Sequence, residues 1–190
     1  MRQIILASSS PRRKQILSKV TDNFLVDSSK YEEVRGTITD PHSLVKIHAE
    51  GKARDVAKKY KDALIIGADS VVYINHEILE KPFSEQEAKE MLGKLSGKKH
   101  EVITGFCIID TESGKSVTES IATNVYFKKL TEEEIDWYVS TGEPMDKAGA
   151  YALQEKGAVF IEKTEGDFYG AVGLPLFHLM KALKSFDVTL

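Results

Sequence analysis

The sequence predicts an α/β fold built on a mixed β-sheet. Helix and strand patterns alternate over the first half of the chain, and residues 64–74 form a long apolar run that is typical of a central strand. Two further strand-like segments follow each other as a hairpin, which a purely parallel sheet would not contain. We expect one folding unit over residues 1–190, because no linker, repeat or low-complexity segment interrupts the chain.

The expected strands are short near both ends of the chain and long in its middle. The hairpin is expected to turn at residues 112–114, Glu-Ser-Gly, between two runs that favour strand. The full set of expected strands comprises residues 4–6, 24–26, 64–74, 100–110, 117–127 and 159–162.

The first four expected helices each begin with a start signal. A polar side chain that can cap the first backbone N–H groups is followed either by Pro at the first helical position or by Glu three residues later. These pairs are Ser10 with Pro11, Asp40 with Pro41, Ser84 with Glu87, and Thr131 with Glu134. The last two pairs are each expected to form a reciprocal capping box. Gly142 is expected to end the fourth helix, and a last helix has an apolar face made of Leu176, Leu179, Met180 and Leu183.

The composition excludes several classes of partner. A net charge of −3 and a pI near 6.0 provide no general attraction to nucleic acid or to an anionic membrane, so neither is expected as a partner. The single cysteine, Cys107, excludes an internal disulfide and a multi-thiolate metal site, and its apolar neighbours predict a buried residue. No apolar run has the length of a membrane-spanning helix, so we expect a cytoplasmic protein.

Residues 8–14, Ser-Ser-Ser-Pro-Arg-Arg-Lys, place an unusual set of polar and charged side chains where a strand is followed by a helix. Hydroxyl groups and three cations gather at a helix start, although the helix dipole disfavours cations there. A bound phosphate would resolve this conflict, because its oxygens accept hydrogen bonds from backbone N–H groups and from arginine. The alternative is an ordinary capped helix with solvated cations.

Two charged residues lie where apolar side chains are expected. Asp69 interrupts the central strand, either as a buried structural acceptor or as a group that holds a metal ion or activates a water. Lys52 follows Val45 by one heptad, near the buried stripe of its helix. Its ammonium group either extends to solvent or reaches a phosphate.

Three further polar residues are less distinctive. Lys81 precedes a turn proline, and Glu32 and Glu33 lie in a polar stretch that is either a solvated loop or a source of metal ligands. Together with Asp69 and the cations, these residues indicate a metal-dependent enzyme that acts on phosphoanhydrides.

The sequence has no Walker loop, no dinucleotide-binding glycine motif and no nucleophile elbow. His42 and His48 are six residues apart, a spacing that predicts different helix faces, so no histidine site for zinc is expected.

Several segments, spread in order along the chain, resemble the Maf family of nucleotide pyrophosphatases. They are residues 5–13, 67–72, 142–151, 166–169 and 172–175. The resemblance implies an elongated mixed β-sheet flanked by helices, with two lobes and a cleft, like inosine triphosphate pyrophosphatase. It implies hydrolysis of a nucleoside triphosphate to the monophosphate and pyrophosphate with Mg²⁺ or Mn²⁺. A homodimer is suggested by relatives.

The resemblance also implies roles for individual residues. Asp69 aligns with the family's proposed general base, and Asp69 with Glu32 would hold the metal, although Glu33 is the alternative to Glu32. Lys52 and Lys81 match catalytic positions. The positions expected to bind substrate are Ser8, Arg12, Arg13, Ser70 and Gln154. Arg12 and Gln154 match the dTTP/UTP branch, whereas Ser70 replaces its usual threonine.

These residues predict a pyrimidine nucleoside triphosphate pyrophosphatase acting on dTTP and UTP, with CTP and modified nucleotides as further candidates. One alternative is a non-catalytic nucleotide-binding regulator of cell division and septum formation. Another is a phosphatase that removes terminal phosphates. Only the pyrophosphatase releases pyrophosphate together with the monophosphate, so product analysis separates the three.

Overall fold

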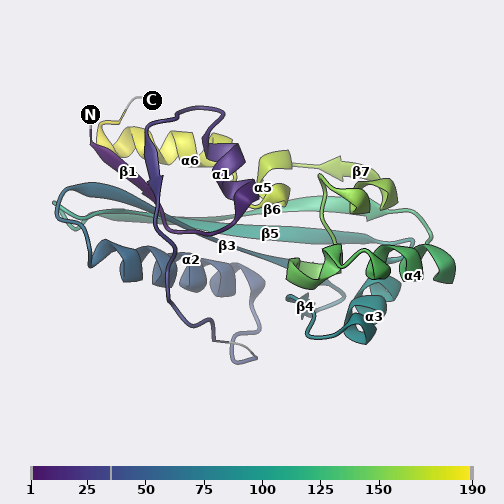
Figure 1. Cartoon of the computed structure of the whole chain (residues 1–190). Coiled ribbons are helices and arrows are strands. Elements are labelled where there is room, and N and C mark those ends of the chain that lie inside the picture. The colour runs from purple at the N-terminus through teal and green to yellow at the C-terminus, as the bar shows by residue number, and fades with distance from the viewer. Residues whose placement is uncertain (1, 35, 189–190) are drawn as a thin grey trace. The chain divides into compact units, whose positions relative to one another are not determined.

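The computed structural model describes residues 2–34 and 36–188, which form a mixed α/β fold (Figure 1). Its sheet has seven strands in the order β2-β1-β3-β5-β6-β7, and β4 pairs with β3. The strands are β1 (Gln3–Leu6), β2 (Phe24–Val26), β3 (Ala63–Ile74), β4 (Glu77–Leu79), β5 (Lys99–Asp110), β6 (Ser116–Phe127) and β7 (Ile161–Glu165). The expectation of an α/β fold with a mixed sheet is confirmed, since β1 pairs in parallel with β2 and β3 while β4 and β7 pair antiparallel.

The helices begin where the capping signals predict. Ser10, Asp40, Ser84 and Thr131 each accept a backbone hydrogen bond at a helix start. The helices are α1 (Pro11–Leu17), α2 (Pro41–Ala57), α3 (Glu85–Leu95), α4 (Glu132–Ser140), α5 (Phe168–Val172) and α6 (Leu176–Leu183), with short 3₁₀ turns at Glu143–Asp146, Ala148–Ala150, Lys156–Phe160 and Lys184–Phe186. Among residues 2–34 and 36–188, no helix has both the length and the apolarity that a membrane span requires.

Two local predictions are wrong. Ser84 and Glu87 do not form the reciprocal capping box, because the Glu87 carboxylate accepts from the N–H of Phe83 instead of Ser84. The last strand begins at Ile161 instead of residue 159, because residues 156–160 form a 3₁₀ turn. The Glu143 carboxylate holds that turn by accepting hydrogen bonds from two successive N–H groups at its start.

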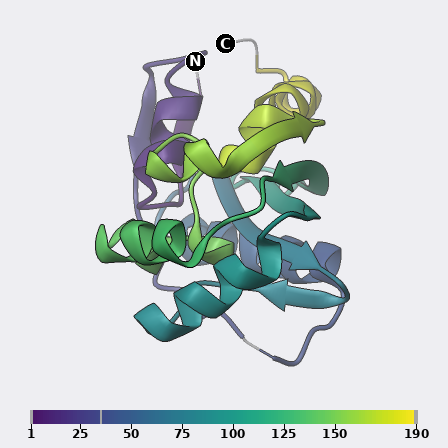
Figure 2. The same cartoon turned by 90° about the vertical axis from the view of Figure 1, so that its right-hand side faces the viewer.

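Within the described residues, the chain divides into two compact units that share the long strands β3, β5 and β6. The first consists of Met1–Asp69, Thr104–Ile121 and Gly173–Leu190, and the second of Ser70–Ile103 and Ala122–Val172. In the first unit, α2 covers one face of the sheet, and α1 and α6 cover the other (Figure 1). In the second, α3 packs beside α4 (Figure 2). That these units form one domain stays a prediction.

Each unit has its own apolar core. In the first, buried alanines of α2 pack against β1, β3 and the buried Cys107 of β5, which confirms the prediction for that cysteine. In the second, the aromatic rings of Phe127, Tyr138 and Phe160 pack among aliphatic residues of α3 and α4.

Two glycines allow α2 to lie directly on the sheet. A Cβ atom added at Gly67 of β3 would lie 2.2 Å from the carbonyl oxygen of Ala49, and one added at Gly105 of β5 would lie 2.6 Å from that of Val45. The neighbouring atoms belong to the helix backbone and cannot rotate away, so any larger residue would force the helix off the sheet.

We therefore predict that Gly105→Ala lowers the free energy of unfolding by about 2 kcal/mol or more, because the new methyl group overpacks the contact between β5 and α2. Urea unfolding followed by circular dichroism would measure it. Gly93→Ala is the matched control, since Gly93 is an exposed residue of α3 with nothing within 4 Å of an added Cβ. Helix propensity should make that variant more stable by up to about 1 kcal/mol. Equal stability of the two variants would contradict the predicted close contact.

Candidate active site

Three parallel strands bring the candidate residues to one edge of the sheet. In the parallel register, Leu6 of β1 pairs with Val26 of β2 and with Ile66 of β3. The chain then continues from β1 to Ser8 and α1, from β2 to the loop of residues 27–34, and along β3 to Asp69. In open α/β sheets, ligands bind beyond the carboxyl ends of parallel strands, which is where these segments meet.

Asp69 is the central residue of this site. Its side chain is only 9% exposed, and each of its carboxylate oxygens has a different partner. Oδ1 accepts a hydrogen bond of 2.6 Å from Nζ of Lys52, and Oδ2 lies 3.3 Å from Nδ1 of His48. Asp69 faces α2 because side chains alternate along a strand and Gly67, two residues earlier, faces that helix as well. His48 and Lys52 are four residues apart, so α2 presents both on one face.

The loop of residues 27–34 adds a second carboxylate. Glu33 Oε1 lies 2.6 Å from Nζ of Lys52, so this lysine bridges Glu33 and Asp69. The loop is held on α2 by Asp55, which accepts hydrogen bonds from the Ser29 hydroxyl and from the N–H of Lys30. Glu32 is exposed, and its role as a metal ligand stays a prediction.

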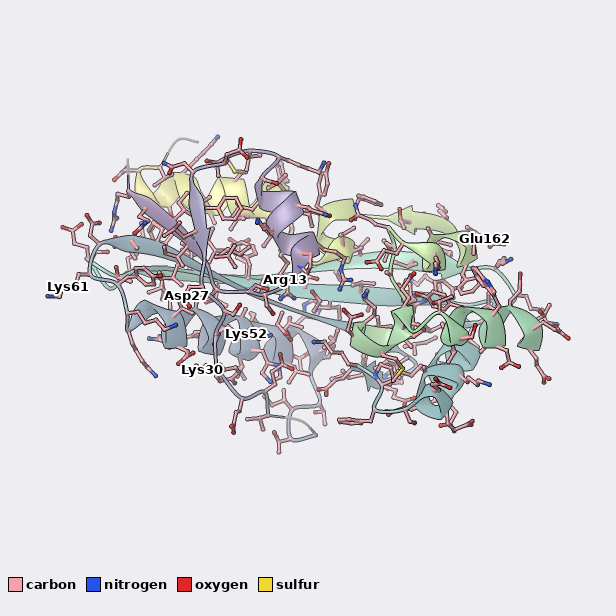
Figure 3. The ribbon with its side chains drawn as sticks, in the orientation of Figure 1. Arg13, Asp27, Lys30, Lys52, Lys61 and Glu162 are labelled. Atoms are coloured by element: carbon pink, nitrogen blue, oxygen red, sulfur yellow. The ribbon has the colours of Figure 1, made fainter. Side chains whose placement is uncertain are left out.

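Arg13 and Ser8 form the part of the site that comes from β1 and α1. The Arg13 Nε donates to the carbonyl oxygen of Gly173 at 2.9 Å, and its terminal nitrogen donates to the buried Ser8 hydroxyl at 3.2 Å. Arg13 therefore has a fixed orientation, and Figure 3 shows it on α1, with Lys52 on α2. Arg12 is half-buried on the same helix.

The cations around Asp69 determine its ionisation. Burial would raise the pKa of Asp69, but the hydrogen bond from His48 and the charges of Lys52 and Arg13 outweigh it and lower that pKa to about 2. Burial would likewise lower the pKa of His48, and the Asp69 carboxylate outweighs it and raises that pKa. Asp69 is consequently an anion at neutral pH although it is buried.

Three side chains of this site could also hold a divalent metal ion. One ligand atom each from Glu33, His48 and Asp69 lie within 4.8 Å of one another. Two carboxylates and an imidazole are donors that a divalent cation accepts, and the carboxylates suit a hard ion such as Mg²⁺ or Mn²⁺.

Three predicted residues belong to the second unit. Ser70 follows Asp69 along β3, so its side chain points to the opposite face of the strand. Lys81 is exposed after β4, and Gln154 is exposed between two 3₁₀ turns. Their functional roles stay predictions that depend on the family resemblance.

Sequence reasoning missed His48, whose side chain is 2% exposed and contacts Asp69. The prediction that His42 and His48 lie apart is consistent with the hydrogen bond of His42 to Ser120 on β6. The signal that could have identified His48 is its spacing of four residues from Lys52, which places the two side chains on one face of the helix.

Comparisons with known proteins identify the family to which the chain belongs. Residues 3–186 match the sequence profile described as Maf-like protein. The chain belongs to the Maf family. A dTTP/UTP pyrophosphatase of Methanosarcina barkeri is 51% identical over 191 residues, covering 100% of this Maf chain and 97% of the relative. A dTTP/UTP pyrophosphatase of Bacillus cereus is 48% identical over 188 residues, covering 99% of this chain and 97% of the relative.

The fold of this Maf protein also matches solved structures. The Ham1 protein of Staphylococcus aureus superposes with a TM-score of 0.55 over 98% of this chain and 100% of that chain, at 12% identity. A HAM1 protein of Coxiella burnetii gives a TM-score of 0.51 at 14% identity. At such identities the likeness concerns the fold alone, and it confirms the expected inosine-triphosphate-pyrophosphatase-like fold.

We predict that Lys52→Met lowers the free energy of unfolding by about 2 to 3 kcal/mol, because it removes the ammonium group that pairs with buried Asp69. Urea unfolding in the presence of chelator would measure it. Lys58→Met is the control, since that lysine is 77% exposed and lies 3.8 Å from Asp55 at the end of the same helix. In a protein that already carries Asp69→Asn, Lys52→Met should lower the free energy of unfolding much less, because the carboxylate that pairs with the ammonium group is absent. Additive effects would contradict a direct interaction.

Proposed function

We propose that the protein hydrolyses pyrimidine nucleoside triphosphates, dTTP and UTP first among them, to the monophosphate and pyrophosphate. CTP and modified pyrimidine nucleotides are further candidate substrates. The observation that carries this proposal is the ionised Asp69 carboxylate, buried among cations beyond the ends of the parallel strands. The relatives named dTTP/UTP pyrophosphatase support the choice of substrate, because they match the chain over nearly its whole length.

The reaction needs a water molecule that attacks a phosphorus atom and a leaving group that accumulates negative charge. As an anion, Asp69 can orient this water and accept its proton, or hold a cation beside it. Fixed cations stabilise the charge that develops on the departing pyrophosphate. Arg13 is suited to this because Gly173 and Ser8 already hold its guanidinium in place.

Lys52 has two partners in the absence of substrate, Asp69 and Glu33. It limits the repulsion between these carboxylates, and we assign it a catalytic role together with Lys81. Arg12, Ser70 and Gln154 would contact the nucleotide. The role of Lys81 and of these last three residues depends on the resemblance to the Maf family.

We propose Glu33 and Asp69 as the carboxylates that would hold a divalent metal ion, Mg²⁺ or Mn²⁺. Glu33 replaces the predicted Glu32 in this proposal, because its carboxylate lies 2.6 Å from the Lys52 ammonium group that also contacts Asp69. Such an ion would neutralise phosphate charge and increase the acidity of a bound water.

The proposed enzyme is cytoplasmic and acts on free nucleotides, without nucleic acid or membrane as a partner. The net charge of −3 supports this, because it provides no general attraction to polyanions. A homodimer is the proposed assembly, and sedimentation equilibrium would test it.

Product analysis tests the central proposal. We expect purified protein with Mg²⁺ or Mn²⁺ to convert dTTP and UTP to monophosphate and pyrophosphate, and excess chelator to stop the reaction. Release of orthophosphate and diphosphate would indicate a phosphatase. Tight binding of nucleotide without turnover would support the regulator of cell division instead.

Asp69→Asn should reduce turnover by about 10²- to 10⁴-fold while the protein stays folded, because the amide can neither accept the proton nor hold a cation. Steady-state kinetics at saturating metal would measure it. Asp62→Asn is the matched control, since that aspartate is 68% exposed and pairs with Arg2. Turnover of Asp69→Asn within threefold of the wild type would rule out the assigned role.

The two arginines of α1 should differ in their effects. Arg13→Lys keeps the charge but loses the forked geometry that contacts Ser8 and Gly173, so turnover of every nucleotide should fall together. Arg12→Lys should instead change the ratio of UTP to purine turnover, if Arg12 helps to recognise the base. Turnover of the four ribonucleotides and dTTP would be measured for both variants. Equal proportional losses on all substrates for both would show that neither arginine recognises the base.

A further inference from the structure

The imidazole ring of His48 lies between two oxygen acceptors. Its Nε2 is 3.1 Å from the carbonyl oxygen of Val34, and its Nδ1 is 3.3 Å from Oδ2 of Asp69. The side chain is 2% exposed, so water cannot readily satisfy either nitrogen. The Tyr31 ring packs near it, with the ring centroids 5.9 Å apart.

These partners constrain where a neutral imidazole carries its proton. A carbonyl oxygen can only accept a hydrogen bond, so Nε2 must carry the N–H that points to Val34. In the metal-free site a protonated ring can also donate from Nδ1 to Asp69, whereas a neutral ring has a single N–H and leaves a lone pair on Nδ1. A divalent cation can therefore take the place of the Nδ1 proton between the ring and the Asp69 carboxylate, because both atoms can present a lone pair to it.

The distances suit a metal ion at that position. Ligand atoms about 2.1 Å from a metal in adjacent coordination positions lie about 3 Å from each other, close to the observed 3.3 Å between Nδ1 and Oδ2. A ligand atom of Glu33 lies within 4.8 Å of both. The contact of Nε2 with Val34 is also the arrangement by which a metal-binding histidine is oriented, because its second nitrogen donates to a backbone carbonyl.

Lys52 does not occupy this position. Its ammonium group contacts Oδ1 of Asp69, whereas Oδ2 is the oxygen that faces His48. The lysine and a metal ion would therefore use different oxygens of one carboxylate, and Lys52 would hold Glu33 nearby.

We propose that Nδ1 of His48 is a third protein ligand, with Asp69 and Glu33, of the divalent metal ion, and that the site therefore prefers Mn²⁺ to Mg²⁺. The inference rests on the proposed function for its two carboxylate ligands. Mg²⁺ favours oxygen donors, whereas transition metals bind imidazole readily, so a nitrogen ligand changes the selectivity of the site.

Electron spin-echo spectroscopy of Mn²⁺ bound to the nucleotide-free protein tests this directly. A directly bound imidazole nitrogen modulates the echo, so we expect a ¹⁴N signal in the wild type and none in His48→Leu. His42→Leu is the matched control, since His42 lies on the same helix and bonds to Ser120. Wild-type protein with Mn²⁺ bound and no nitrogen modulation would overturn the proposal, whatever the variants do.

Metal affinity provides a second measurement. Titration calorimetry should show that His48→Leu weakens Mn²⁺ binding at least tenfold and changes Mg²⁺ binding less than threefold. His48→Gln keeps a polar group and serves if the leucine variant does not fold. Equal losses for both ions would show that His48 only supports the structure. Pyrophosphate release with Mg²⁺ and no ¹⁴N signal would refute this inference alone. A ¹⁴N signal without nucleotide turnover would refute the proposed function and leave the metal ligand in place.

Discussion

A carboxylate buried in an apolar strand requires cations around it, and the arrangement of this site follows from that requirement at Asp69. An uncompensated charge in this position would be protonated or would destabilise the fold. Instead, Lys52 and His48 contact the two oxygens separately, and the charge of Arg13 adds to them. These groups come from α1 and α2, on opposite faces of the sheet in the first unit. The anion thus links segments that are distant in sequence.

The position of α2 determines which side chains can reach this anion. Because Gly67 has no side chain, the backbone of α2 at Ala49 lies directly against β3. Asp69 is two residues further along the same face of the strand, so the neighbouring turns of the helix place His48 and Lys52 beside it. A small residue in the strand is therefore as important for the site as the charged groups themselves.

The loop of residues 27–34 shows how a segment without regular structure can be positioned for function. Asp55 accepts two hydrogen bonds from its start, and Tyr31 lies against Gly51, where an added Cβ would be 2.4 Å from the ring. His48 contacts the carbonyl of Val34 at its end. Glu33 lies between these attachments, so its approach to Lys52 follows from contacts on both sides.

Local sequence determined the elements of this protein and the residues that break their patterns. The capping residues Ser10 and Asp40 define helix starts, and the apolar run that ends at Ile74 defines β3, because these signals act between near neighbours. Asp69 and Lys52 were identified for the same reason, as charges in positions where local patterns require apolar side chains. Which of Glu32 and Glu33 contacts Lys52, and the contact of His48 with Asp69, could be decided only by the tertiary structure. Both depend on how a loop and a helix pack against a strand that lies elsewhere in the sequence, and no local pattern records such distances.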